Sequence, residues 1–316
     1  MNLFIFNFSN VRTMIKRLTF NIILVALVVF ILDFAIGKTL RHFYFKEIAG
    51  IHYRSTYSIE QTKADILVFG ASRANRHYAT EIFEDSLKMT FYNTGRDANG
   101  IFYQTAVLKS VLKRYSPKII ILDYSGDFTP ERREYDNLSS LLPYYRTHKE
   151  LRQEIELRSR YERIKLLSES YPFNSQMLTI VMGNLEADKK RNPDNKGYMP
   201  LQTAFPPQMM VFTSEKSYAV DSNKVKSFQE FIVKAKESGA RVYVIYSPLF
   251  WKVARNQDVE ICEKVCSDVK VPFWDFSRDT FFLSRQDLFY DNTHLNEGGA
   301  KLFSGLIANK IKMSEK

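Results

Sequence analysis

Two short segments hold the residue types that a serine nucleophile and its base require. Asp291 and His294 stand three residues apart, a spacing that lets both side chains share one turn, with the carboxylate holding the imidazole ring. An imidazole held in this way can take the proton of a serine hydroxyl. Ser72 supplies such a hydroxyl directly after the hydrophobic run 64–69, where a strand is expected to turn into a helix. Because ligands bind beyond the carboxyl ends of strands in open parallel α/β sheets, the two segments predict a serine hydrolase or acyltransferase.

Each segment alone has a simpler explanation. Gly70-Ala71-Ser72 could be a plain helix start, and residues 291–294 could be a polar surface turn. Ala74 stands where the G-x-S-x-G elbow of α/β-hydrolases has its second glycine, so that fold is not indicated. Their combination is more informative, because a doubly wound sheet can bring the end of its first strand and the turn before its last helix to one edge.

Strand and helix patterns alternate along most of the chain. The runs 64–69, 91–93, 118–123, 241–246 and 272–275 predict strands, and the segments 81–88, 100–115, 223–238, 255–267 and 296–312 predict the helices between and after them. The run of β-branched residues in 118–123 is typical of a strand buried on both faces. The pattern predicts an α/β domain over residues 63–316 with a parallel sheet of about five strands and helices on both of its faces.

A long polar segment, residues 128–215, separates the third predicted strand from the fourth. It contains a charged stretch, 148–169, with a helical pattern, and then a loop rich in Pro, Asn and Lys at 192–198. Loops of this length are rarely idle in a compact domain. We expect a helical insertion that shapes or covers the site.

The N-terminus carries one strongly apolar segment. Residues 18–36 give about nineteen residues with few polar members, which as a helix approach the ~30 Å thickness of the hydrocarbon core. A buried core helix and a cleaved signal peptide are the alternatives. Apolar residues on all faces argue against the first, and the lack of a small-x-small cleavage site argues against the second. The segment therefore predicts a transmembrane anchor, preceded by a tail (1–17) and followed by a linker (37–62).

Flanking charges say little about which side of the membrane the domain occupies. Lysine and arginine stand on both sides of the apolar segment. The Lys16-Arg17 pair directly before it slightly favours a cytoplasmic N-terminus. We accordingly expect a single-pass membrane protein with an extracytoplasmic domain.

Composition excludes several other classes of protein. The chain has 316 residues, 45% of them apolar and 25% charged, which is typical of a globular protein. Its net charge of +10 is spread along the chain without a basic run, so no nucleic-acid partner is expected, and proximity to anionic lipid or an acidic polymer explains the charge more simply. Nucleotide-binding and zinc-protease motifs are absent, and the two cysteines, Cys262 and Cys266, are too few for a metal site. We expect no cofactor and no metal.

At three places the sequence resembles the SGNH/GDSL hydrolase superfamily: Gly70-Ala71-Ser72, then Asn93-Thr94-Gly95, then Asp291-Asn292-Thr293-His294. More narrowly it resembles the membrane-anchored branch that works beside envelope acyl-transfer systems, such as the D-alanyl transfer and alginate acetylation proteins. The resemblance covers residues 64–125 and 240–312. It implies a flavodoxin-like three-layer α/β/α sandwich, with Ser72 as nucleophile, His294 as general base and Asp291 as the residue that orients it.

The same resemblance implies an oxyanion hole. The backbone N–H groups of Ser72 and Gly95 would provide two donors, and Gly95 lets the backbone approach a substrate closely because it lacks a Cβ atom. The family's third donor is an Asn in a G-x-N-D segment after the third strand, and this chain has Asp123-Tyr124-Ser125-Gly126-Asp127 there instead. Asn93, Ser125 or no residue at all could take that place.

Two arginines follow the serine closely. Arg73 and Arg76 could form a solvated first turn of a helix, or they could contact or steer an anionic substrate. His77 is expected to point away from the site.

These expectations combine into one function and two alternatives. The first is a membrane-anchored esterase or O-acyltransferase that acts on acyl esters of envelope glycan or another carbohydrate through a serine acyl-enzyme. Hydrolysis and transfer share the first half-reaction, so the sequence does not separate them. The second is a weakly catalytic or non-catalytic partner of a multi-pass membrane acyltransferase, favoured by the altered third segment. The third is a structural membrane protein in which the motifs are accidental.

Overall fold

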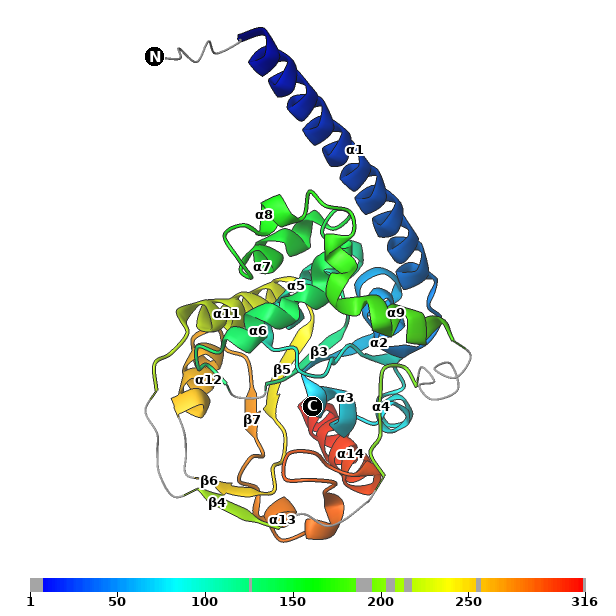
Figure 1. The fold of residues 1–316 in the computed structure, drawn as a ribbon. Helices are drawn as coiled ribbons and strands as arrows, with labels where there is room; N and C mark the ends of the chain where they lie inside the picture. The colour runs from blue at the N-terminus through cyan, green and yellow to red at the C-terminus, as the bar shows by residue number, and fades with distance from the viewer. Residues whose placement is uncertain are drawn as a thin grey trace.

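The computed structural model describes residues 8–124, 127–185, 195–202, 208–212, 218–253 and 257–314. Its centre is a five-stranded parallel sheet, and one long helix projects from the domain (Figure 1). The strands lie in the spatial order β2 (Phe91–Asn93), β1 (Ile66–Gly70), β3 (Ile119–Asp123), β5 (Arg241–Tyr246) and β7 (Phe273–Asp275). The fold is therefore α/β, as the alternating pattern predicts.

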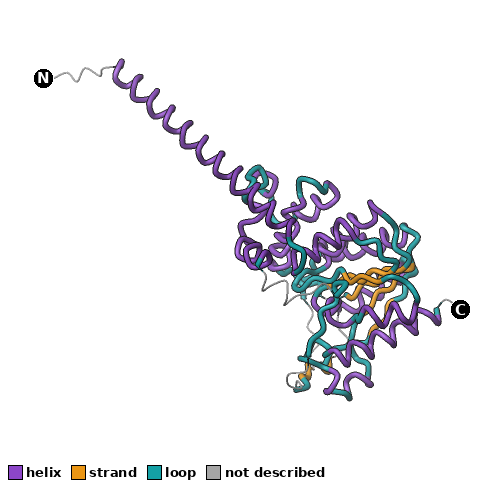
Figure 2. Tube along the Cα trace, turned by 90° about the vertical axis from the view of Figure 1, so that its right-hand side faces the viewer, coloured by secondary structure: helices purple, strands orange, loops and turns teal. Residues whose placement is uncertain are grey.

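Helices cover both faces of the sheet, which is seen close to edge-on in Figure 2. Alternate residues of each strand pack into different cores, since successive side chains point to opposite faces. Leu67 and Phe69 of β1 contribute to one core, and Ile66 and Val68 contribute to the other. The first core packs under α5 (Ile101–Arg114) and α11 (Ser222–Glu237), and the second under α3 (Ser72–His77), α4 (Thr80–Leu87) and α14 (Glu297–Met313).

Most predicted elements lie within two residues of their observed bounds. The strands predicted at 91–93 and 241–246 have those bounds, and β1 and β3 are displaced or shortened slightly. Gly239 ends α11 with φ +83°, and Asn296 caps α14 by accepting a hydrogen bond from the N–H of Gly299 at 3.0 Å. The helix predicted at 255–267 corresponds to α12 (Gln257–Asp268). A second, two-stranded sheet of β4 (Met210–Phe212) and β6 (Trp251–Val253) was not predicted.

The region between β3 and α11 contains short helices rather than one charged helix over 148–169. The guanidinium of Arg146 donates to the carbonyls of Leu166 and Leu167, so it links the start of this segment to its end. The elements are α6 (Arg132–Asn137), η2 (Leu138–Tyr144), η3 (Lys149–Leu151), α7 (Arg152–Glu156), α8 (Glu162–Lys165), η4 (Tyr171–Gln176) and α9 (Met177–Asn184). Of the loop predicted at 192–198, residues 195–198 are described and contain a turn, and residues 192–194 lie outside the described residues.

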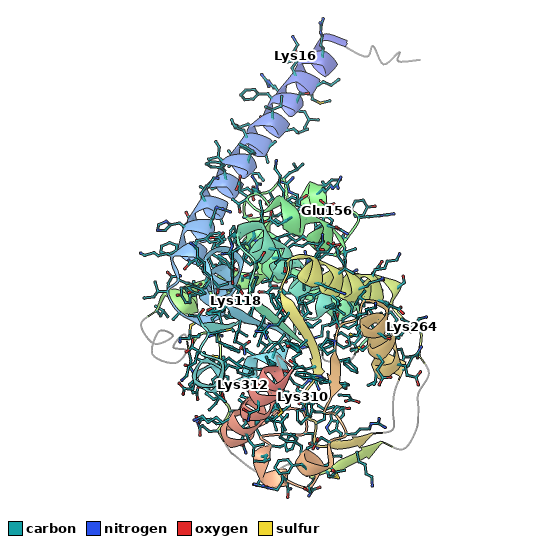
Figure 3. All side chains as sticks on the ribbon, turned by 180° about the vertical axis from the view of Figure 1, so that it is seen from behind. Lys16, Lys118, Glu156, Lys264, Lys310 and Lys312 are labelled. Atoms are coloured by element: carbon teal, nitrogen blue, oxygen red, sulfur yellow. The ribbon has the colours of Figure 1, made fainter. Side chains whose placement is uncertain are left out.

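The projecting helix, α1 (Phe8–Lys46), is long and apolar enough to cross a membrane. Side chains surround its free part, with Lys16 near the outer end (Figure 3), and its apolar side chains there are mostly exposed. The segment predicted as a linker, 37–62, is instead helical: α1 continues to Lys46 and is followed by α2 (Gly50–Thr56) and a π-helical turn, η1 (Tyr57–Gln61). Arg114 holds this turn by donating to the carbonyls of Ser58, Ile59 and Thr62.

Gly70 makes the turn from β1 into α3 possible. Its φ is +146°, and a Cβ atom there would lie 2.5 Å from the carbonyl oxygen of Asp123 and 2.7 Å from the Cβ of Ala74. Gly239 also has a positive φ, yet no heavy atom lies within 4 Å of the Cβ it would carry. An alanine at Gly239 would therefore meet backbone strain alone, whereas an alanine at Gly70 would meet both strain and steric overlap.

We expect Gly239→Ala to lower the free energy of unfolding by about 1–2 kcal/mol through strain alone. Gly70→Ala should cost about 1–3 kcal/mol more, because overlap with Asp123 and Ala74 adds to the strain. Chemical unfolding followed by near-ultraviolet circular dichroism measures both losses. Equal losses in the two variants would contradict the close approach at Gly70.

Candidate active site

The serine hydroxyl and the imidazole meet at the carboxyl edge of the sheet. Ser72 is the first residue of α3, directly beyond β1, and its Oγ lies 2.8 Å from Nε2 of His294. Nδ1 of the same ring lies 2.9 Å from Oδ2 of Asp291 and 3.0 Å from Oδ1. Ser72 and His294 are both partly exposed. With the Nδ1 proton donated to Asp291, the lone pair of Nε2 is left to accept the Ser72 hydroxyl.

The turn at 291–294 is organised by the carboxylate itself. Oδ1 of Asp291 accepts from the backbone N–H of Thr293 and of His294, each at 2.8 Å, and from the hydroxyl of Thr293 at 2.9 Å. Burial favours the neutral form, but the hydrogen bonds and the nearby imidazole outweigh it, so the pKa of Asp291 lies well below its usual value. The carboxylate thus stays charged opposite the ring that it orients.

A second histidine, His77, contacts the residue that follows this turn. His77 is fully buried, and its Nε2 accepts the backbone N–H of Leu295 at 2.9 Å. Its ring lies 6.3 Å from that of His294, centroid to centroid. The expectation that His77 points away from the site is therefore wrong. The contact was missed because it joins the end of α3 to a backbone N–H more than two hundred residues later, and no spacing in the sequence indicates such a bond.

Arg73 lies inside the protein rather than in a solvated helical turn. Its guanidinium donates to the carbonyl of Tyr124 at 3.0 Å and to that of Ser247 at 3.4 Å, and it lies over the ring of Tyr246. One nitrogen is also 4.0 Å from Asp123. Arg73 therefore ties the start of α3 to the chain just beyond β3 and β5. Its contact with a substrate stays a prediction.

Arg76 is partly exposed and pairs with Asp97 at 2.5 Å. Asp97 also accepts a hydrogen bond from the side chain of Asn75 at 3.0 Å. This pair stands at the opposite end of α3 from Ser72, and a role for Arg76 toward a substrate likewise stays a prediction.

The predicted oxyanion donors contact each other. The N–H of Gly95 donates to Oδ1 of Asn93 at 2.9 Å, and Nδ2 of Asn93 donates to the carbonyl of Ala74 at 2.6 Å. A Cβ at Gly95 would lie 2.8 Å from the backbone nitrogen of Asn75, so the glycine is also needed for packing against α3. Both groups would have to release these bonds to hold an oxyanion. Ser125, the other candidate for the third donor, lies outside the described residues.

The end of the insertion runs past the site. The carbonyl of Lys196 accepts from the N–H of Asn93, and the N–H of Met199 donates to the carbonyl of Asn75, both at 2.9 Å. Farther along, the side-chain amide of Asn292 donates to the carbonyl of Gln208 at 2.7 Å. Described parts of the insertion therefore border both the α3 side and the histidine turn of the site.

Among the described residues, no group of three or more His, Cys, Asp or Glu side chains could hold a metal ion. Comparison with known proteins adds no family: no protein-family model matches the chain, and no curated protein matches its sequence.

His77 leads to a pH-dependent prediction. Burial, followed by the charges of His294 and Arg73, lowers the pKa of His77 well below its ordinary value of 6.5. The unfolded chain therefore binds this proton at a higher pH than the folded one. The resulting stability is present above about 6.5 and falls as the pH drops below that value.

We expect His77→Gln to flatten the fall in thermal stability below about pH 6.5, since the amide does not titrate but can still accept a hydrogen bond from Leu295. His77→Ala should flatten it equally and also lose about 1–3 kcal/mol at neutral pH, because the N–H of Leu295 loses its partner. Melting curves from pH 5 to 8 test both variants. An unchanged pH dependence in the two variants would show that His77 is not held neutral.

Proposed function

We propose that this protein is a membrane-anchored serine esterase or O-acyltransferase. The observation that carries the proposal is the chain of contacts from Ser72 Oγ to His294 Nε2 at 2.8 Å and from His294 Nδ1 to Asp291 at 2.9 Å. The same three groups in the same order activate serine in unrelated hydrolases. Ser72 is the proposed nucleophile, His294 the general base and Asp291 the residue that orients the imidazole.

In the proposed reaction, His294 takes the hydroxyl proton as Ser72 Oγ attacks the carbonyl carbon of an acyl ester. Collapse of the tetrahedral intermediate breaks the ester bond, and the imidazolium returns its proton to the leaving alcohol. Water or a sugar hydroxyl then attacks the acyl-enzyme, with the imidazole again taking the proton. Collapse of this second intermediate breaks the bond between the acyl group and Ser72 Oγ, and the imidazolium returns the proton to that oxygen. Asp291 stabilises the imidazolium that forms in both steps, and its low pKa keeps it charged.

The oxyanion requires donors that this resting site does not present freely. We assign the role to the backbone N–H groups of Ser72 and Gly95, with Asn93 as a further donor. A small rotation of the Asn93 side chain would free the N–H of Gly95, which now donates to it at 2.9 Å. Each oxyanion donor contributes roughly 3 kcal/mol in known enzymes, so the loss of one would slow the reaction strongly. Substrate binding therefore has to bring about this rotation.

We assign the domain to the SGNH/GDSL type with a flavodoxin-like three-layer sandwich. The strand order supports this assignment: numbered within this sheet alone, the strands lie in the order 2-1-3-4-5, which is the flavodoxin-like order. The position of Ser72 directly beyond β1 supports it as well.

We further propose that α1 anchors the protein with its N-terminus in the cytoplasm and the domain outside it. The support is the length and apolarity of α1 and the Lys16-Arg17 pair before the apolar run. An external domain held at the membrane favours acyl esters of envelope glycan or another carbohydrate as substrate. Arg73 and Arg76 would favour an anionic one.

A second function is favoured by one observation. Because the N–H of Gly95 donates to Asn93, and the side-chain amide of Asn93 donates to Ala74, the site lacks a ready oxyanion hole. A weakly catalytic or non-catalytic partner of a multi-pass membrane acyltransferase would need none. Retention of a complete Ser72, His294 and Asp291 arrangement favours the enzyme.

Acyl-enzyme formation distinguishes the two functions. With p-nitrophenyl acetate we expect a burst of p-nitrophenol and an acetyl group on the peptide that contains Ser72. Ser72→Ala should abolish both, and Asp291→Asn should slow the burst by about 10⁴-fold, as in known triads. Ser222→Ala, which removes an exposed serine at the first position of α11, is the matched control and should react normally. A folded protein without a burst, or a burst that survives Ser72→Ala, would contradict the enzyme.

A further inference from the structure

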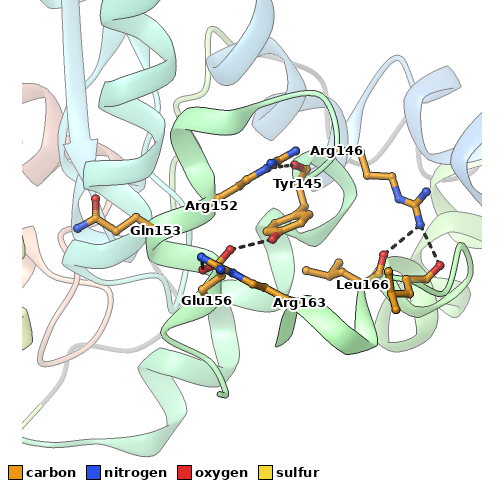
Figure 4. A pocket seen from close by; sticks show the side chains of 8 residues that line it. Tyr145, Arg146, Arg152, Gln153, Glu156, Arg163 and Leu166 are labelled. Atoms are coloured by element: carbon orange, nitrogen blue, oxygen red, sulfur yellow. Dashed lines mark hydrogen bonds and ion pairs between the residues drawn. The ribbon is translucent and has the colours of Figure 1, made fainter. Parts of the chain in front are cut away.

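A hollow lined by arginines lies on the insertion, away from the serine. Arg146, Arg152 and Arg163 line it together with one carboxylate, Glu156, and its remaining walls come from Tyr145, Gln153, Leu166 and Leu167 (Figure 4). Three cationic side chains therefore face a single anionic one. No role in the proposed reaction explains this surface.

The hollow lies beside the end of the apolar part of α1. Asp33, near the end of that part, accepts hydrogen bonds from the hydroxyls of Ser168 and Ser170 at 2.6 and 2.5 Å, and from the N–H of Glu169 at 2.7 Å. Gly37 lies against the backbone of Glu169, and a Cβ atom there would overlap it. Leu166 and Leu167 of the hollow directly precede this junction. If α1 crosses a bilayer, the hollow is thus held at the level of its headgroups.

Large apolar side chains project from the same surface. Leu167 is 77% exposed, Ile164 is 64% exposed and Tyr161 is 50% exposed. Their exposure is costly in water but favourable at a membrane interface, where leucine, isoleucine and tyrosine enter the boundary between headgroups and acyl chains. Figure 1 places α7 and α8 at the end of the domain that lies toward α1, and Figure 3 places Glu156 there, far from Lys310 and Lys312.

The arginines differ in how much of their charge is already used. Arg146 is bound to Glu169 and to backbone carbonyls, so it mainly holds the junction. Arg163 pairs with Glu156 at 2.7 Å, but its side chain is 77% exposed. Arg152 lies over the ring of Tyr145 and donates Nε to the carbonyl of that residue. Arg152 and Arg163 are therefore the groups best placed to meet an incoming phosphate.

We propose that this surface docks on the bilayer that α1 crosses, with phosphates of anionic lipid headgroups at Arg152 and Arg163 and with Leu167 and Ile164 in the interface. The inference rests on the proposed anchoring by α1 and is independent of the serine chemistry. Docking at a second place besides α1 fixes the orientation of the domain relative to the membrane. It would therefore hold Ser72 at a constant height above the lipid surface.

Site-directed spin labels in the full-length protein test the proposal in lipid nanodiscs. Cys262 and Cys266 are buried, so labelling is directed to a new cysteine. Leu167→Cys reports the docking surface, and Val28→Cys, in the apolar part of α1, reports the anchor. Leu178→Cys is the matched control: this leucine is 75% exposed on α9. α9 contacts Phe43 near the C-terminal end of α1 and Glu47 just after it, both farther along the chain than Asp33.

We expect the labels at 28 and 167 to be reached by oxygen and shielded from a water-soluble nickel complex, while the label at 178 is reached by the nickel complex. Shielding at 28 with a fully aqueous label at 167 would overturn the docking and leave the anchor standing. Aqueous labels at both positions would overturn the anchor and the docking together. Either result is separate from the outcome of the acyl-enzyme experiment.

The proposed binding of headgroup phosphates at Arg152 and Arg163 is tested by varying the lipid composition. In nanodiscs with phosphatidylglycerol, the label at 167 should be more immobile than in nanodiscs of phosphatidylcholine alone. The double change Arg152→Gln with Arg163→Gln should remove that difference, and Lys113→Gln with Arg132→Gln, two exposed cations elsewhere, should retain it. A difference that survives loss of both hollow arginines, or none in the unaltered protein, would overturn the assignment of phosphate to this hollow.

Discussion

The hydrogen bond between Ser72 and His294 joins residues that are 222 positions apart, and the rest of the site depends on it. Such a bond at 2.8 Å requires that the end of β1 and the turn before α14 reach the same edge of the sheet. Parallel pairing of β1 with β3, and of β3 with β5, sets that edge. Gly70 permits the sharp entry into α3, Arg73 ties α3 to the carbonyls beyond the neighbouring strands, and His77 holds the N–H of Leu295 behind the imidazole. Local turns and long-range packing thus agree on one position for the hydroxyl.

The sequence predicts those features that depend on local pattern. Apolar runs locate the strands, because a strand buried on both faces has no polar residues to interrupt it, and the spacing of Asp291 and His294 indicates a shared turn. Features that depend on partners far along the chain were missed or misjudged. The sequence allows a solvated helical turn for Arg73 and places His77 away from the site, yet both residues are buried and bonded to distant backbone groups. The bond between Gly95 and Asn93 depends on a side-chain rotamer, which residue types alone do not specify. The segment 37–62 has no strong periodicity, and its helical turn is held by Arg114.

The long helix α1 belongs both to the predicted anchor and to the folded domain, which the sequence analysis divides into an anchor and a linker. Its N-terminal part is exposed and apolar, while Tyr44 near its C-terminal end is almost fully buried in the first core. Asp33 lies between them and is matched by donors from residues 168–170. The helix that we propose as an anchor therefore also supports the insertion. The arginine hollow beside this junction is where the domain would meet lipid, and the serine lies in a different part of the fold.

The central claim is that His294 activates Ser72, and reaction with a fluorophosphonate tests it most directly. The reagent should label the full-length protein in detergent at Ser72 alone, as mapped by peptide mass spectrometry, because this serine hydroxyl is bonded to an imidazole that can take its proton. Replacement of His294 by Ala should remove the labelling while the fold, judged by circular dichroism, is retained. A folded protein that does not react, or one that reacts at the same rate without His294, would contradict the account.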